Sequence, residues 1–470
     1  MLKKFFKSVL PSMAAFTFSS LYCIVDGFFV GRNVGDAGLA AVSIAYPLTA
    51  LMQALGTGIG MGGAIQIATS RGKKEEETAF SFLGNTLLLL FAAWIGVTAL
   101  LLFSYKPLLA LMGAEGQVLN YAADYAGIML AGAGFQIFAT GCVPLLRNYD
   151  APVLAMMSMI AGFSTNIVLD WLFVSRLSLG VAGAAWASIL GQAVTLLPCL
   201  FFLRRILSFR NLHLLRPRFN RAKMIFLIGL SPMGLTLSPN LALMMLNKAS
   251  AVWGGAVAVA AYAVTGYVIT VIYLLLQGVG DGTQPLISFY RGMGEPQKTK
   301  QLRTMAYWTA LFTALLNLLL LVVLRRQIPV FFGACTEAGA LTAHMLPLFS
   351  IGAVFLSFCR ISTSYFYSIR RNSLAYILVY GELVFLGIFL LILPRFLGTD
   401  GVWYSVPASQ FLLFVLAVFF ILREKSQHKQ ENAHKENQHA QQLYQKIAHL
   451  RILRITDQAF YNTVAGSRKN

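Results

Sequence analysis

The stretch Leu21-Tyr22-Cys23-Ile24-Val25-Asp26-Gly27-Phe28-Phe29-Val30-Gly31-Arg32 decides the fold, because it places a single carboxylate inside an otherwise apolar helix. The chain from Val9 to Val25 carries no charge at all. An ionised Asp that faced lipid would cost several kcal/mol, so Asp26 must face protein or water. An acid at this depth indicates a functional site inside a membrane protein.

The composition supports a polytopic all-α membrane protein. Of the 470 residues, 57% are hydrophobic and only 12% are charged. Apolar runs of about 20 residues or more recur, each long enough to cross about 30 Å of hydrocarbon. They predict twelve transmembrane helices in two six-helix lobes, over 8–31, 38–69, 79–104, 118–143, 152–175, 181–203, 224–249, 255–288, 303–324, 339–368, 372–394 and 402–422.

The basic residues predict the orientation and the domain boundaries. Loops on the side of the N-terminus carry 20 Lys and Arg residues and the opposite loops carry 7, so both termini are expected to be cytoplasmic. The net charge of +19 is therefore spread over alternate loops and does not indicate a nucleic-acid partner. We predict a first lobe (1–203), a basic cytoplasmic linker (204–223), a second lobe (224–422) and a polar, His-containing cytoplasmic tail (423–470).

The two halves repeat at an offset of 220 residues. Without a gap, this offset pairs Leu55, Gly58, Gly60, Gly62, Ile67, Arg71 and Gly72 with Leu275, Gly278, Gly280, Gly282, Ile287, Arg291 and Gly292. Since six helices return the chain to the same side, the lobes should be related by an axis along the membrane normal. Such proteins bind their cargo between the repeats. The ordinary role of each glycine is close helix packing.

Depth predicts that two acids meet. Asp26 lies six residues from Arg32, and Asp170 lies six residues from Arg176, which places both carboxylates about 9 Å below the same surface. The two carboxylates are therefore expected to share one site.

Two further polar residues lie at a matching depth. Asn166 is four residues before Asp170 on the same helix face, and Ser188 is on the following helix. Carboxylate, amide and hydroxyl oxygens suit a hard cation such as Na⁺, and crowded carboxylates can also hold a proton. The alternative is that Asp170 caps a loop and that Asn166 joins helices by hydrogen bonding. At the 220-residue offset Asp26 falls on Leu246, beside Asn247, so the ion chemistry is expected only in the first lobe.

At this point the sequence resembles the multidrug and toxic compound extrusion (MATE) family, in the branch with the DNA-damage-inducible and Gram-positive efflux members. The resemblance covers residues 1 to about 422. It rests on Asp26-Gly27-Phe28-Phe29-Val30-Gly31-Arg32, Asn166-Ile167-Val168-Leu169-Asp170, Gly180-Val181-Ala182-Gly183-Ala184-Ala185-Trp186-Ala187-Ser188, Gly282-Thr283-Gln284-Pro285-Leu286-Ile287-Ser288-Phe289-Tyr290 and Gly401-Val402-Trp403.

The resemblance implies a V-shaped pair of lobes that exports amphipathic, usually cationic compounds across the bacterial plasma membrane in exchange for Na⁺ or H⁺. It implies a coupling-cation site at Asp26, Asn166, Asp170 and Ser188, where threonine is more common at the last position. It implies no cofactor beyond the coupling ion, contact with membrane lipid, and a monomer.

Three residues are candidates for the substrate cleft, namely Asn247, Gln284 and Glu382. Glu382 stands near mid-membrane where similar proteins tend to carry basic or amide residues. It is expected either to take part in transport, by contacting cationic cargo or carrying a proton, or to pair with an intramembrane base such as Arg360. Asp281 is expected to be a loop or gate residue.

The sequence leaves other functional classes as alternatives to an exporter. A lipid-linked precursor flippase of the same superfamily is the second reading, although its cleft should be lined with arginines. An enzyme would need a His with Asp or Ser at active-site spacing in the spans, and only His344 lies in one. A channel and a non-transporting scaffold are further alternatives, and the parallel repeat with broken, Gly-rich helices suits alternating access better than either.

Overall fold

The computed structural model describes residues 1–206, 216–333 and 335–424, and within these ranges the chain is helical without any strand. The predicted linker lies partly outside the described residues, and the predicted tail lies outside them from residue 425 onward. The helices are α1 Leu2–Val34, α2 Asp36–Gly72, α3 Glu76–Leu111, α4 Gly116–Ala131, α5 Ala133–Asn148, α6 Pro152–Asp170, the π-helical η1 Trp171–Arg176, α7 Gly180–Ile206, α8 Phe219–Gly292, α9 Pro296–Leu324, α10 Gln327–Phe331, α11 Thr336–Ser368, α12 Asn372–Leu397 and a last helix over Thr399–Glu424.

The helices provide the twelve predicted crossings. Ten helices of the described chain are long and apolar enough to span a membrane, and α4 with α5 forms one further span bent by 58°. Helix α8 is 74 residues long and is broken at Gly255, where φ is 62° and ψ is −158°. Because one crossing needs about 20 residues, α8 supplies two of them. The predicted all-α fold is confirmed.

The backbone repeats with the same 220-residue period as the sequence. Most residues whose backbone lies in the left-handed region, with φ between 55° and 95°, occur in pairs that this period relates. Such conformations are strained for residues with a Cβ atom, so they mark turns that the helix ends require. The pairs are Gly35 and Gly255, Lys74 and Gly294, Gly113 and Gly333, Asp150 and Arg370, and Ser178 and Gly398.

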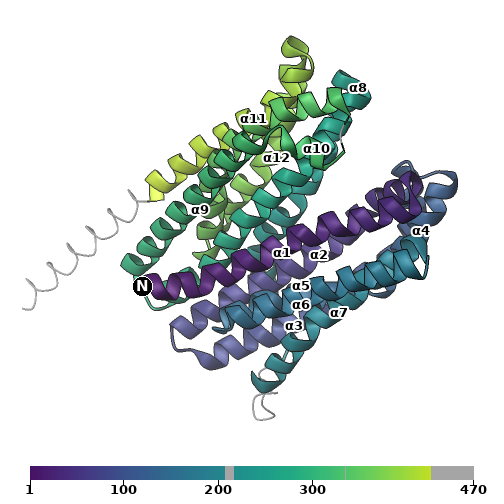
Figure 1. Cartoon of the computed structure of the whole chain (residues 1–470). Helices are drawn as coiled ribbons and strands as arrows, with labels where there is room; N and C mark the ends of the chain where they lie inside the picture. Colours follow the sequence, from purple (N-terminus) through teal and green to yellow (C-terminus); the bar gives the residue numbers. More distant parts are fainter. Residues whose placement is uncertain (207–215, 334, 425–470) are drawn as a thin grey trace, which may run out of the picture. The chain divides into compact units, whose positions relative to one another are not determined.

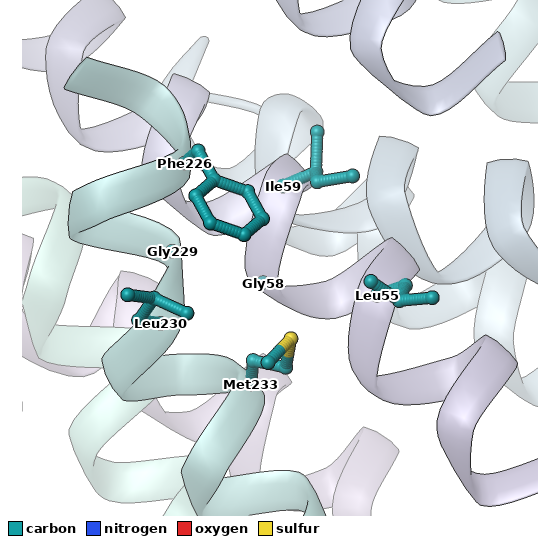
Figure 2. A pocket seen from close by; sticks show the side chains of 7 residues that line it. All are labelled: Leu55, Gly58, Ile59, Phe226, Gly229, Leu230 and Met233. Atoms are coloured by element: carbon teal, nitrogen blue, oxygen red, sulfur yellow. The ribbon is translucent and has the colours of Figure 1, made fainter. Parts of the chain in front are cut away.

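Glycines let α2 and α8 approach the opposite half of the chain closely. A Cβ atom on Gly58 would lie 2.8 Å from the carbonyl oxygen of Gly229, and one on Gly282 would lie 2.7 Å from the Cα of Val9. The 220-residue offset takes Gly282 back to Gly62, one turn along α2 from Gly58, and takes Val9 to Gly229. The two contacts are therefore approximately related by the repeat. Figure 2 shows the first of these contacts, where Gly58 and Gly229 face each other beside a narrow apolar crevice.

The period also relates Gly72 to Gly292, and these two glycines meet each other. A Cβ atom on Gly72 would lie 2.1 Å from the carbonyl oxygen of Phe289, and one on Gly292 would lie 2.1 Å from that of Thr69. Residues 69 and 289 are themselves related by the period, so the contact lies on the pseudo-two-fold axis. We call this end of the helices, which also carries Asn148 and Ser368, the Gly72 end.

The first predicted lobe and the second lobe up to Val415 lie within one compact unit, Met1–Val415, and a second unit begins at Leu416. Within the first unit, Figure 1 shows the purple-to-blue helices α1–α7 gathered together and the green helices α9, α11 and α12 gathered beside α8. One apolar cluster runs through α1–α7, and another joins α8, α11 and α12 to Trp403 and Val406. The lobe boundaries themselves remain predictions.

Candidate functional site

The structure brings the carboxyl groups of Asp26 and Asp170 together. Asp26 lies in α1 and Asp170 is the last residue of α6, and their carboxyl groups are within hydrogen-bonding reach of each other. Asp170 is fully buried. The chain changes from α-helix to π-helix directly after Asp170, a local distortion that is frequent at functional sites.

Small residues explain why α6 and α7 present their polar groups to one another. A Cβ atom on Gly162 would lie 2.6 Å from the carbonyl oxygen of Gly191, so the two backbones touch. One turn further along α6, the side-chain amide of Asn166 donates a hydrogen bond to the Ser188 hydroxyl at 3.4 Å. Asn166 and Ser188 are buried, with 2% and 6% of their surfaces exposed.

Tyr125 of α4 is the site residue that the sequence reasoning missed. Tyr125 is buried, and its hydroxyl is close to Ser188 and to both carboxyl groups. Depth would have found it, because Tyr125 is nine residues after Gly116 at the start of α4, just as Asp26 is nine residues before Gly35. The depth comparison covers acids, an amide and a serine, and an aromatic hydroxyl such as that of Tyr125 lies outside it.

Four buried oxygen atoms at this site have no hydrogen-bond donor. They are Oδ1 of Asp26, Oδ1 of Asn166 and both carboxyl oxygens of Asp170. Buried oxygen atoms are normally paired, and two ionised carboxylates in contact repel each other strongly. An all-oxygen set with two carboxylates fits a hard monovalent cation, and the same pair of carboxyl groups fits a shared proton.

The second lobe carries an apolar cluster at the equivalent place. The 220-residue offset takes Asp26 to Leu246, Tyr125 to Met345 and Asn166 to Leu386. All three of these residues are buried in one hydrophobic cluster with Tyr262, Phe349 and Trp403. The repeat therefore preserves the scaffold and replaces the oxygen atoms with packed side chains.

Glu382 pairs with Arg360 inside the second lobe. The distance from Arg360 Nη2 to Glu382 Oε2 is 3.4 Å, and the two side chains are 4% and 9% exposed. The guanidinium group of Arg360 also lies over the ring of Tyr273, at 5.5 Å from the centroid. Of the two roles considered for Glu382, the structure contains the intramembrane ion pair.

The other two cleft candidates lie apart from this pair. Gln284 lies at the Gly72 end, where its amide nitrogen donates to Asn148 Oδ1 at 3.2 Å and to the Ser288 hydroxyl at 2.9 Å. Asn247 is half-buried in α8. Asp281, expected to be a loop or gate residue, is buried and forms an ion pair with Arg147 of the first lobe.

Sequence comparison finds relatives among export proteins. The multidrug export protein MepA of Staphylococcus saprophyticus is 26% identical over 301 residues, which is 62% of this chain and 65% of the relative. MepA of Staphylococcus aureus (strain MRSA252) is 27% identical over 288 residues, which is 60% of this chain and 62% of the relative. The chain thus spans less than two thirds of the length of these relatives.

Structural comparison finds the same fold over nearly the whole chain. A multidrug resistance MATE family transporter of the MOP superfamily, in an outward-facing conformation, matches with a TM-score of 0.86 and 25% identity, over 91% of this chain and 96% of the other. A MOP superfamily transporter from Pyrococcus furiosus Vc1 (DSM3638), described by the reverse polarity of its binding pocket, matches with a TM-score of 0.85 at 24% identity, over 90% and 96% of the two chains. The second likeness concerns the fold alone.

The family model for MatE matches residues 11–172 and 232–399, one segment in each half of the chain. Together the two segments cover well over half of the sequence and end within the twelve helices described above. The chain is a multi-pass membrane protein that belongs to the MatE family, the multidrug and toxic compound extrusion transporters.

Proposed function

We propose that this chain is a cation-coupled antiporter that exports amphipathic, mostly cationic compounds across the bacterial plasma membrane by alternating access. The similarity to multidrug export proteins supports export of several drugs. The single observation that carries the coupling is the set of four donor-less oxygen atoms around Asp26 and Asp170. The coupling ion, Na⁺ or H⁺, is bound by Asp26, Asn166, Asp170 and Ser188. Tyr125 is the fifth residue of this ion site.

Helix α1 provides a mechanical link from this site to the opposite lobe. Asp26 lies toward one end of α1, and near the other end the Ser8 hydroxyl donates a 2.6 Å hydrogen bond to the carbonyl of Gly282 in α8. Between these points a Cβ atom on Gly278 would lie 2.8 Å from the Cα of Met13. A shift of α1 on ion binding or release therefore alters the contact between the lobes.

The loop charges support an orientation for the proposed antiporter. By the positive-inside rule, the Gly72 end and both termini are assigned to the cytoplasm. The glycine contacts close the Gly72 end, which supports placing this conformation at the outward-facing step of the proposed cycle. One charge moving inward through about 100 mV supplies roughly 2.3 kcal/mol, and each tenfold concentration gradient adds about 1.4 kcal/mol.

The test is transport by the full chain in proteoliposomes with an imposed Na⁺ or H⁺ gradient. We expect a cationic dye to move against its own gradient when either ion flows in the opposite direction. Lack of gradient-driven movement for a panel of cationic dyes, together with flipping of a fluorescent lipid-linked pyrophosphate, would replace this proposal by the flippase function.

A further inference from the structure

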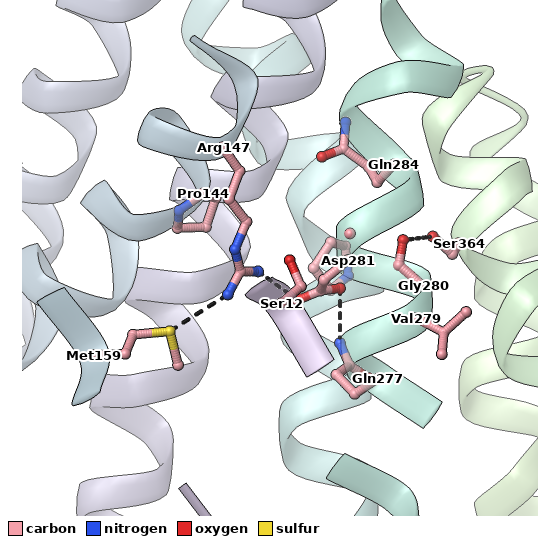
Figure 3. Close-up of polar contacts among 12 residues, drawn as sticks. Ser12, Pro144, Arg147, Met159, Gln277, Val279, Gly280, Asp281, Gln284 and Ser364 are labelled. Atoms are coloured by element: carbon pink, nitrogen blue, oxygen red, sulfur yellow. Dashed lines mark hydrogen bonds and ion pairs between the residues drawn. The ribbon is translucent and has the colours of Figure 1, made fainter. Parts of the chain in front are cut away.

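A buried ion pair joins the two lobes at the Gly72 end. Arg147 is in α5 of the first lobe and Asp281 is in α8 of the second, and Nη1 of the arginine donates to Oδ2 of the aspartate at 3.3 Å. Each side chain is only 4% exposed. Figure 3 shows the two groups reaching toward each other from the facing helices. Removing one partner of such a pair leaves a buried charge without compensation, which is strongly unfavourable.

Each charged group also has neighbours that belong to its own lobe. The second carboxyl oxygen of Asp281 accepts hydrogen bonds from Gln277 at 3.1 Å and from the Tyr367 hydroxyl at 3.5 Å. Arg147 contacts the sulfur of Met159 at 3.4 Å and lies over the ring of Phe16. If the lobes part here, Asp281 keeps two donors, whereas Arg147 keeps, among the described residues, a sulfur and an aromatic ring. Parting the lobes therefore takes from Arg147 the carboxylate with which it pairs.

The pair has no counterpart in the repeat. The 220-residue offset takes Arg147 to Tyr367 and takes Asp281 back to Met61, so the symmetric position has no charges. Next to the pair, the side chains of Asn148 and Gln284 bridge the same two lobes. The symmetric glycine contacts let the two lobes touch, and the asymmetric polar contacts add charge to one side of that surface.

We infer that Arg147 and Asp281 are positioning residues that form a latch, which holds the Gly72 end closed and whose opening is required before cargo and ion can exchange with that side. This inference deepens the proposed alternating-access function and rests on it. In the closed state the pair excludes water, and in the open state water solvates both groups. The latch therefore sets the ratio of open to closed molecules without touching the ion site.

The experiment measures that ratio by electron–electron spin distance measurement on the full-length protein in lipid nanodiscs, without cargo or ion gradient. Spin labels are attached through Glu77→Cys and Gln297→Cys, in a background whose native cysteines are replaced. These two positions are exposed, lie in the first turns of α3 and α9, and are related by the 220-residue offset. Asp281→Asn and Arg147→Gln are each expected to raise the open-to-closed ratio at least about tenfold, which corresponds to about 1.4 kcal/mol.

The double variant is expected to shift the ratio less than the sum of the two single changes, because no lone charge remains buried. Glu295→Gln is the matched control, since it breaks an exposed pair with Lys298 inside the second lobe and should leave the distances unchanged. Wild-type distances in both single variants, or additive shifts in the double variant, would overturn the latch. Arg147→Lys is the substitute if the single variants do not fold. A lysine cannot reach Asp281 and Met159 together, so this variant should still raise the open-to-closed ratio. Wild-type distances in Arg147→Lys would equally overturn the proposal. Since no transport is measured, a latch result is independent of whether the proposed ion coupling holds.

Discussion

Arg360 and Glu382 form an ion pair within the second lobe, with 3.4 Å between Nη2 and Oε2 and with both side chains almost inaccessible to solvent. The Arg360 guanidinium lies over the Tyr273 ring, and the amide of Gln410 donates a 2.6 Å hydrogen bond to the Tyr273 hydroxyl. A self-compensated pair of this kind stabilises the lobe only while both partners are present.

We therefore expect Glu382→Gln to lower the stability of the protein by about 3 to 5 kcal/mol, because it leaves the Arg360 guanidinium buried without a counter-charge. The double replacement Arg360→Met with Glu382→Leu should restore much of that loss. The check is thermal unfolding of purified protein in detergent, with Glu295→Gln as an exposed-pair control that should change stability by about 1 kcal/mol or less. If Glu382→Gln is as stable as wild type and loses only the export of cationic cargo, Glu382 is a residue of the substrate cleft and not of a structural ion pair.

Gly72→Ala and Gly292→Ala should weaken closure of the Gly72 end equally, because each new Cβ atom would lie 2.1 Å from a carbonyl oxygen of the other lobe. Alanine stabilises an isolated helix by about 1 kcal/mol relative to glycine, so any loss of closure comes from the contact between lobes. The measurement is the spin-label distance between positions 77 and 297, which should lengthen in both variants. Gly96→Ala is the control, since nothing lies within 4 Å of its added atom. Lengthening in only one variant would show that the two glycines are not equivalent.

Asn85 of α3 connects the chain just before α8 to the first lobe. Its amide nitrogen donates to the carbonyl of Arg216 at 3.3 Å, and its oxygen accepts from the backbone N–H of Arg218 at 2.7 Å. Asn85→Leu should accelerate hydrogen exchange of the Arg218 amide by about 2- to 13-fold, since a net intramolecular hydrogen bond contributes about 0.5 to 1.5 kcal/mol. Asn317→Leu, which removes a bond to Thr313 in its own helix, is the control. Unchanged exchange in Asn85→Leu would mean that other contacts hold the start of α8.

The sequence was sufficient for the twelve helices, the repeat and the meeting of Asp26 with Asp170. These features follow from hydrophobic length, internal similarity and depth below one surface, all of which can be counted along the chain without knowing how the helices pack. The repeat even extends to turn geometry, since Asp150 and Arg370 have the same left-handed backbone although their charges are opposite.

The contacts between lobes could not be predicted in this way. In the sequence, Arg147 is one of the 20 basic residues of the loops on the side of the N-terminus. Its pairing with Asp281, 134 residues away, depends on how the two lobes pack. The choice between two roles of Glu382 also needed the position of Arg360 on a neighbouring helix. Tyr125 was missed for a different reason, because an aromatic residue in an apolar span is usually a packing residue.

The most direct measurement compares cargo binding with ion-driven transport in Asp26→Asn and Asp170→Asn. The amide keeps the shape of each side chain and removes its charge. We expect both variants to fold, to bind a fluorescent cationic dye in detergent, and to show no dye accumulation in proteoliposomes under either a Na⁺ or an H⁺ gradient. Asp124→Asn, an exposed acid next to Tyr125 on α4, should transport like wild type. Wild-type accumulation by either site variant under both gradients would contradict a coupling ion held between Asp26 and Asp170.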